Sequence, residues 1–245
     1  MPPLEIYIGC AGWAIPKGTS GEFPSAGTHL ERYARRFPAV EINSSFYRAH
    51  RPETYARWAA STPEAFRFAV KVPRPVTHLS RLADPGLLGD FRIQTASLGE
   101  KLGVWLVQLP PSLAFDARKV EVFFSAVRRI FDGNVACEPR HPSWFTPDVD
   151  NLFSEYRVAR VAADPTLSTR AAAPGGWHEL VYYRLHGSPQ VYHSSYSLEY
   201  LEALAQHLLE AAHRPAQVWC IFDNTAEGAA VANALAVLNK LQSSE

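Results

Sequence analysis

Short apolar runs rich in β-branched and aromatic residues recur along the whole chain. Most of them do not alternate between apolar and polar positions, which is typical of strands buried on both faces, as in parallel sheets. The eight runs lie at residues 6–13, 39–47, 66–73, 103–111, 134–142, 157–165, 180–187 and 217–225. The pattern therefore predicts eight buried strands.

Segments with the period of amphipathic helices separate most of these runs. The first begins with a capping box, in which the side chains of Thr28 and Glu31 would satisfy each other's backbone amides. Later ones begin at Pro52, which suits a first helical position, and at an Asp116 cap. The predicted helices cover residues 28–37, 52–61, 116–131, 197–213 and 226–241.

This alternation of strands and helices predicts an α/β protein with a single domain over residues 1–245, a (β/α)8 barrel of the TIM type. We find no linker, repeat or low-complexity segment that would divide the chain. One connection departs from the pattern. Residues 165–179, between the sixth and seventh predicted strands, have turn-forming residues and no amphipathic period. Long irregular loops of this kind are often functional, and this one is a candidate lid.

Composition and charge narrow the class of protein. Of the 245 residues 47% are hydrophobic, and 24 basic side chains balance 24 acidic ones. A globular protein is expected, and a globally basic nucleic-acid-binding protein is disfavoured. A local basic cluster nevertheless keeps nucleic acid as a candidate partner; it comprises Arg32, Arg35, Arg36, Arg48, His50 and Arg51.

The expected cellular compartment follows from sequence features that we do not find in the chain. No apolar run approaches the length of a membrane-spanning helix, and the start, MPPLEIYIGC, has no secretory-signal pattern. The three cysteines share no CxxC spacing and lie within apolar runs, as expected of buried, reduced thiols. We therefore expect a cytoplasmic protein without membrane attachment.

Nearly every predicted strand ends in a polar or charged side chain. In a barrel, these carboxyl-terminal ends meet at one rim, where binding and catalysis take place. Three pairs are spaced two residues apart, so each pair shares one face of its strand. The pairs are Glu41 with Asn43, Glu138 with Arg140, and Arg184 with His186; single contributions come from Lys71, Gln108, Asp164, Asp223 and Asn224.

Structural roles remain open for each of these residues. Glu138 with Arg184, or Glu41 with Lys71, could be ion pairs that fill the barrel, because buried charges require compensation. His141 precedes a proline and could only shape the turn. Asp223, Asn224 and Thr225 could simply begin the last helix.

The chemistry of the predicted rim favours a small anionic or sugar-like ligand. Lys71, Arg140 and Arg184 supply positive charge, and the planar guanidinium group suits phosphate or carboxylate. The Gly187–Ser188 turn and the helix start near Asn224 agree with the phosphate sites of many barrels. Aromatic side chains at the same rim could stack on a planar ligand; the candidates are Trp13, Phe46 and Trp144.

No cofactor is expected, because the chain has no dinucleotide-binding, P-loop or nucleophile-elbow motif. A divalent metal is a weaker alternative, since the basic groups of the rim would oppose a cation and no HExxH motif is present. The oxygen and nitrogen ligands that such a metal could use are Glu41, Glu138, His141, Asp164, His186 and Asp223.

Seven motifs, in order, resemble the YecE-like family, a domain of unknown function. They are IGCAGW, VEINSSFYR, FAVKVPR, GVWLVQLPPS, CEPRHPSW, YYRLHG and FDNTAEGAAVANA, and they extend over essentially the whole chain. The resemblance implies a TIM-barrel fold and a pocket, but no activity. Its motif residues correspond here to Glu41, Asn43, Lys71, Gln108, Glu138, Arg140, His141, Arg184, His186 and Asn224. The family often has Asn where this chain has Asp223, which favours Asn224 over Asp223 as a site residue.

Three functions are compatible with these observations. The first is a hydrolase or lyase, with Glu138 as general acid or base, His186 as its partner and Glu41 as a third catalytic candidate. In that case Lys71, Arg140 and Arg184 would bind the anion. The second is a metal-dependent nuclease or isomerase, and the third a non-catalytic module that binds nucleic acid or a phosphorylated metabolite.

Overall fold

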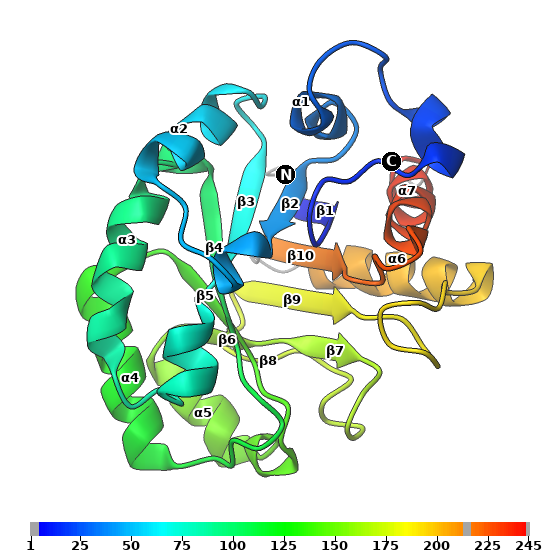
Figure 1. Ribbon diagram of the computed structural model, residues 1–245. Helices are drawn as coiled ribbons and strands as arrows, with labels where there is room; N and C mark the ends of the chain where they lie inside the picture. Colours follow the sequence, from blue (N-terminus) through cyan, green and yellow to red (C-terminus); the bar gives the residue numbers. More distant parts are fainter. Residues whose placement is uncertain (1–4, 213–216, 244–245) are drawn as a thin grey trace.

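The computed structural model describes residues 5–212 and 217–243, in which strands and helices alternate as predicted (Figure 1). The first residues of MPPLEIYIGC and His213, the last residue of one predicted helix, lie outside this part. The strands are β1 (Ile6–Cys10), β2 (Ala39–Ile42), β3 (Arg67–Lys71), β4 (Leu102–Gln108), β5 (Asn134–Glu138), β6 (Val158–Arg160), β7 (Ala162–Asp164), β8 (Gly175–Gly176), β9 (Leu180–Leu185) and β10 (Gln217–Phe222). The helices are α1 (His29–Ala34), α2 (Pro52–Ala60), α3 (Leu88–Ala96), α4 (Ala117–Ile130), α5 (Pro147–Glu155), α6 (Leu198–Ala212) and α7 (Ala229–Gln242).

Local capping agrees with several sequence signals. Thr28 forms the predicted capping box with Glu31, and the Asp116 side chain accepts a hydrogen bond from Lys119 N. Helices α3 and α5 were not predicted. Helix α5 begins with a Thr146 cap and Pro147, a signal present in the sequence. Helix α3 has three buried residues but no amphipathic period that would have identified it.

The strands form two sheets, with the orders β1-β10-β9-β7 and β2-β3-β4-β5-β6-β8. All ladders are parallel except that between β6 and β8. The predicted α/β fold with parallel strands is therefore confirmed. The predicted closed barrel is not confirmed, because the six-stranded sheet does not close. The barrel therefore stays a prediction.

The two sheets nevertheless approach each other at two places. Strands β6 and β7 are separated by Val161 alone, and they belong to different sheets. At the other edge, Gly12 N donates a hydrogen bond of 2.9 Å to Glu41 O, and Ala11 forms an isolated parallel bridge with Glu41. The carboxyl ends of β1 and β2 are therefore adjacent.

The connection at residues 165–179, all of them described, contains no helix. Its only regular structure is β8, which pairs antiparallel with β6 through Gly175 and Gly176. This agrees with the predicted irregular connection. No helix in the described ranges is both long and apolar enough to cross a membrane.

Both faces of the strands are covered, which explains the unalternating apolar runs. On β4, Trp105 and Val107 belong to a large core that packs against the helices, whereas Val104 and Leu106 belong to a second core on the opposite face. Helices α2 to α5 lie outside β3 to β6 (Figure 1). The cysteines are free, buried thiols in the large core, at Cys10, Cys137 and Cys220.

The second core becomes polar where the strands end. Its apolar members include Ala39 on β2, Ala136 on β5 and Ile221 on β10. Two residues further along each of these strands, on the same face, stand Glu41, Glu138 and Asp223. This face therefore carries the candidate site.

The contact between β1 and β2 predicts the effect of a glycine substitution. A Cβ atom at Gly9 would lie 2.2 Å from Ala39 O, so Gly9→Ala forces the two strands apart. We expect a loss of about 1–3 kcal/mol in unfolding free energy, with Tm lower by about 2–4 °C per kcal/mol, measured by circular dichroism. Gly18→Ala is the control, because nothing lies within 4 Å of its Cβ position. Equal Tm values for both variants would contradict this close approach.

Candidate functional site

The centre of the polar cluster is the guanidinium group of Arg184 on β9, which is fully buried. Its Nη2 lies 2.6 Å from Glu41 Oε1 and 3.0 Å from Asp223 Oδ2, while Nη1 lies 3.1 Å from Glu138 Oε2. Its Nε donates a further hydrogen bond of 3.0 Å to Glu41 Oε2. Three carboxylates from β2, from β5 and from the end of β10 therefore surround one cation.

His186 follows two residues later, on the same face, and lies between two of these carboxylates. Its Nδ1 is 3.0 Å from Asp223 Oδ2, and its Nε2 is 2.9 Å from Glu138 Oε1. The Tyr192 ring stands edge-on to the imidazole, with 5.7 Å between the ring centroids. A carboxylate therefore faces each ring nitrogen, and the two contacts fix the orientation of the imidazole.

Glu138 is held as an anion. Its carboxylate receives hydrogen bonds from Gln108 Nε2 at 3.1 Å and from Arg184, and Arg140 Nε lies 3.0 Å away. Burial alone would raise the pKa of this group, but the nearby charges of Arg140, His186 and Arg184 hold its pKa well below the usual range. Glu138 therefore stays ionised at neutral pH and orients its neighbours.

Lys71, the last residue of β3, differs from the other charged groups. Its side chain is only 5% exposed, yet its ammonium group makes no hydrogen bond or ion pair among residues 5–212 and 217–243. It lies over the Phe46 ring, 4.3 Å from the centroid. Burial, reinforced by the charge of Arg184, lowers the pKa of Lys71 to about 8, although Glu41, Glu138 and Asp223 oppose the shift.

Arg140 lies on the solvent side of the cluster, with a side chain 19% exposed. Its Nε faces Glu138 and its Nη2 lies 3.2 Å from His186 Nε2. Its Nη1 makes no hydrogen bond in the part of the chain that the structure describes. Arg140 and Lys71 thus retain donor capacity that the protein itself does not use.

Asn43 and Trp13 line a neighbouring cleft of about 490 Å³, together with Gly12, Arg48 and Trp58. The Trp13 and Trp58 rings meet edge to face, with centroids 5.1 Å apart. The Oδ1 atom of Asn43 is buried without a hydrogen-bond partner. This cleft lies beside the Glu41 side of the cluster, because Ala11 also lines it and is bridged to Glu41.

Three predicted ligand-binding residues lie apart from the cluster. His141 caps a 3₁₀ turn by accepting a hydrogen bond from Ser143 N, and Trp144 is a core residue whose Nε1 donates to Leu113 O. Asn224 Nδ2 donates to Ser194 O and to Asn233 Oδ1.

Asp223, not Asn224, contacts the cluster, so the preference for Asn224 over Asp223 gains no support from these contacts and stays a prediction. Adjacent residues at the end of β10 point to opposite faces, and only Asp223 lies on the face of Arg184. Tyr182 was also missed, although it is two residues before Arg184 and so shares its face. Its hydroxyl donates a hydrogen bond of 3.0 Å to Glu41 Oε2. Asp164 instead accepts a hydrogen bond from the Tyr196 hydroxyl at 2.9 Å.

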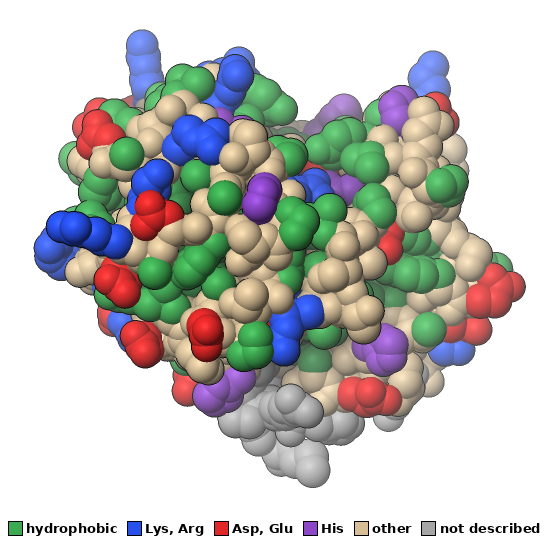
Figure 2. All heavy atoms as spheres, turned by 90° about the horizontal axis from the view of Figure 1, so that it is seen from below, with side chains coloured by type: hydrophobic (Ala, Val, Ile, Leu, Met, Phe, Trp, Pro, Cys, Tyr) green, Lys and Arg blue, Asp and Glu red, His purple; other side chains and the backbone are tan. Residues whose placement is uncertain are grey.

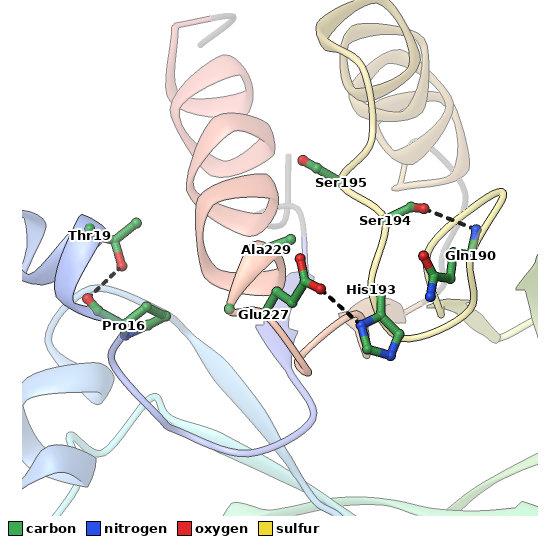
Figure 3. A pocket seen from close by; sticks show the side chains of 10 residues that line it. Pro16, Thr19, Gln190, His193, Ser194, Ser195, Glu227 and Ala229 are labelled. Atoms are coloured by element: carbon green, nitrogen blue, oxygen red, sulfur yellow. Dashed lines mark hydrogen bonds and ion pairs between the residues drawn. The ribbon is translucent and has the colours of Figure 1, made fainter.

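An open cleft of about 480 Å³ lies beside the last helix, but it is not lined by Gly187, Ser188 or Asn224, where phosphate was predicted (Figure 3). Pro16 and Thr19 line one side, and His193 and Glu227 line it elsewhere as a contacting pair, with Nδ1 and Oε1 3.2 Å apart. The carboxylate of Glu227 would repel an anion there.

The charges of the cluster balance. The carboxylates of Glu41, Glu138 and Asp223 face the basic side chains of Lys71, Arg140 and Arg184. Among the described residues, no group of three His, Cys, Asp or Glu side chains is arranged to hold a metal ion. Glu138 and Asp223 contact opposite nitrogens of His186 and so do not converge with it on one point.

Removal of the central cation is the first test of this network. Arg184→Met leaves three buried carboxylates without their shared partner, and we expect it to lower the unfolding free energy by about 3–5 kcal/mol in urea denaturation. Arg157→Met is the control, because its ion pair with Asp132 is exposed and should contribute little. A loss no larger than that of the control would contradict the central role of Arg184.

Residues 7–245 match the family described as "Protein of unknown function DUF72". The chain is 32% identical over 142 residues to the UPF0759 protein YecE of Escherichia coli (strain K12), and 30% identical over 151 residues to the UPF0759 protein YunF of Bacillus subtilis (strain 168). These matches cover 57% and 58% of this chain, and 50% and 53% of the two relatives, so they span about half the length of each.

Two solved structures share the fold. A DUF72 family protein from Enterococcus faecalis V583 has a TM-score of 0.83 at 23% identity, over 97% of this chain and 95% of that one. Another from Thermotoga maritima MSB8 has a TM-score of 0.80 at 24% identity, over 97% and 99%. At these identities the likeness establishes the fold alone. Because the family match extends over nearly the whole chain, the protein belongs to the DUF72 family.

Proposed function

We propose that this protein is an enzyme of the hydrolase or lyase type, acting on a small phosphorylated, carboxylated or sugar-acid ligand at the Arg184 cluster. The single observation that carries the proposal is the unused donor capacity of Lys71 and Arg140. Both lie at the edge of the buried network, and each is one of the three cations that offset its three carboxylates. An anion is the ligand that two such cations would bind.

The fold offers a suitable place for such a site. We propose that the two sheets together form one distorted (β/α)8 barrel, supported by the near-continuity of β6 with β7 and by the Gly12–Glu41 hydrogen bond. The second core, which includes Leu106, Ala136 and Trp219, would then fill its interior. The cluster would lie above this core at the carboxyl ends of the strands, the catalytic end of such barrels.

Within the site, His186 is the proton donor and acceptor. Asp223 holds its Nδ1, and the carboxylate of Glu138 faces its Nε2, so a proton on Nε2 is stabilised but exchangeable. Glu138 and Glu41 act as positioning residues, because hydrogen bonds to Arg184 occupy their oxygens. Lys71 and Arg140 neutralise the ligand and stabilise developing negative charge.

The basic cluster that suggested nucleic acid is partly engaged elsewhere. Arg32 Nε donates to Pro24 O, Arg36 Nη2 donates to Asn239 Oδ1, and His50 contacts the Ser44 hydroxyl. On the face seen in Figure 2, basic and acidic side chains are interspersed. These observations favour a small ligand over a nucleic-acid backbone, which requires a continuous basic surface.

A thermal-shift panel tests the proposal. We expect at least one of phosphate, a sugar phosphate, a dicarboxylate or a sugar acid to raise Tm. A ligand at about 100 times its Kd stabilises the protein by about 2.7 kcal/mol. Arg140→Gln should abolish the shift, whereas Arg129→Gln on the outer surface of α4 should retain it. A shift unchanged in Arg140→Gln would place the anion elsewhere, and no shift from any class would contradict the proposal.

The free-energy cost of burying Lys71 without an ion-pair partner gives a second prediction. Because its folded pKa lies below that of the unfolded chain, the charged form is disfavoured by folding. This destabilisation is fully present below pH 8 and disappears as the pH rises through the unfolded pKa of about 10.4. Lys71→Met should therefore raise the unfolding free energy at pH 7 by up to about 3 kcal/mol, with a smaller gain at pH 9.5.

Lys101→Met is the matched control for this measurement. The ammonium group of Lys101 donates to Ala59 O, Thr62 O and Thr62 Oγ1, so its removal should destabilise the protein. A lower stability for Lys71→Met at pH 7 would show that Lys71 has a structural role instead.

A further inference from the structure

Lys71 is a buried amine without a polar partner, whereas Lys101 has three oxygen acceptors. An amine that is desolvated and close to another cation is a nucleophile at neutral pH, because a usable fraction of it carries a free electron pair. Both conditions hold at Lys71, where burial is the largest influence and Arg184 the nearby cation. With a pKa of about 8, roughly a tenth of Lys71 is neutral at pH 7, against fewer than about one in a thousand of ordinary lysines.

We propose that Lys71 forms a Schiff base with the carbonyl carbon of its substrate, a small keto acid or phosphorylated aldehyde. This inference rests on the proposed function, since it takes the anion site as given and names the reacting group. The anionic end of the substrate would lie against Arg140, whose Nη1 is unused, and the carbonyl group would lie against Lys71. The Phe46 ring covers the amine on one side, with its centroid 4.3 Å from the ammonium nitrogen.

The covalent step balances without an oxidant or reductant. The electron pair of Lys71 Nζ forms a bond to the carbonyl carbon, and the carbonyl oxygen takes up a proton. A second proton reaches that oxygen and it leaves as water, while the nitrogen gives up its two amine hydrogens in exchange for the two protons taken up by the oxygen, and a C=N bond remains. Protonation of this nitrogen creates an electron sink, which suits a lyase because it stabilises the carbanion left by cleavage beyond the carbonyl.

His186 is the group that handles the protons of this step. Its Nε2 lies among Glu138, Arg140 and Arg184, and its Nδ1 is held by Asp223. Glu138 stays ionised and so cannot supply a proton itself. A keto acid bound between Lys71 and Arg140 therefore meets a nucleophile, an anion-binding group and a proton carrier from three different strand ends.

Reductive trapping tests the inference on the full chain. The protein is incubated with pyruvate, glyoxylate or glyceraldehyde 3-phosphate and sodium cyanoborohydride at pH 7, and the adducts are located by peptide mass mapping. The chain has five lysines, Lys17, Lys71, Lys101, Lys119 and Lys240. We expect trapping at Lys71 to exceed that at each other lysine by about tenfold or more. The α-amino group, with an ordinary pKa of about 8, is a reference of equal basicity.

Two variants and one measurement on the unaltered protein complete the design. Lys71→Arg keeps the charge but should lose the adduct, and Lys101→Arg should keep it. In case Lys71→Arg does not fold, an amine-reactive reagent on the unaltered protein should modify Lys71 with a rate midpoint near pH 8. Adducts distributed evenly over the lysines, or confined to the α-amino group, would overturn the Schiff base.

The two proposals fail in different ways. If anions raise Tm through Arg140 but no carbonyl probe is trapped at Lys71, the Schiff base is wrong and the anion site stands. If neither an anion shift nor an adduct is found, both are wrong. If an adduct forms at Lys71 while Arg140→Gln leaves trapping unchanged, the amine is reactive but the proposed anion contact at Arg140 is wrong.

Discussion

The ion network around Arg184 is the interaction on which the rest of the site depends. Arg184 and Asp223 come from β9 and the end of β10 in one sheet, whereas Glu41 and Glu138 come from β2 and β5 in the other. Charges buried this deeply are tolerated only when they are paired and hydrogen-bonded. One guanidinium group therefore contacts three carboxylates at once and ties the two sheets together at the ends of their strands.

In this arrangement the interior groups of the network bind one another, whereas Lys71 and Arg140 at its edge keep hydrogen-bond donors that the protein does not use. Glu41, Glu138 and Arg184 are fully buried, and their oxygens and nitrogens are occupied by one another, by Tyr182 and by Gln108. Such a network is rigid, since any displacement would break several charge-assisted hydrogen bonds at once. The edge, at Lys71 and Arg140, then holds cations in fixed positions without satisfying them. Fixed, unsatisfied groups are what ligand binding and catalysis require.

The sequence predicts the strands and the face that carries the polar side chains. It does not predict which of these side chains pair with each other. Unalternating apolar runs identify buried strands, and two-residue spacing identifies which side chains share a face. Neither determines which carboxylate meets which cation. The sequence left open a Glu41–Lys71 ion pair, whereas Glu41 is bound to Arg184 and Tyr182. The family motif likewise favoured Asn224, although strand geometry puts Asp223 on the site face.

Some features depend on distant contacts and could not be predicted at all. His141 and Trp144 follow β5 at the predicted rim. The His141 side chain instead caps a local turn, and the Trp144 side chain packs in the core. Helix α3 has no amphipathic period, so only its packing defines it. The contact between β1 and β2 at Gly12 and Glu41 depends on how near the edges of the two sheets approach, which no local pattern records.

The ionised state of Glu138 means that another residue must donate the proton in the proposed reaction. A carboxylic acid could donate a proton only if burial prevailed over the cations around it, and here the cations prevail. Glu138 therefore has no proton to give, and its carboxylate, 2.9 Å from His186 Nε2, orients the imidazole. The three carboxylates form their ion pairs with Arg184 and, at Glu138, with Arg140, and none of these pairs includes the ammonium group of Lys71. A buried lysine that the protein does not pair is stabilised by a ligand that brings the missing charge, or by losing its proton and becoming a nucleophile.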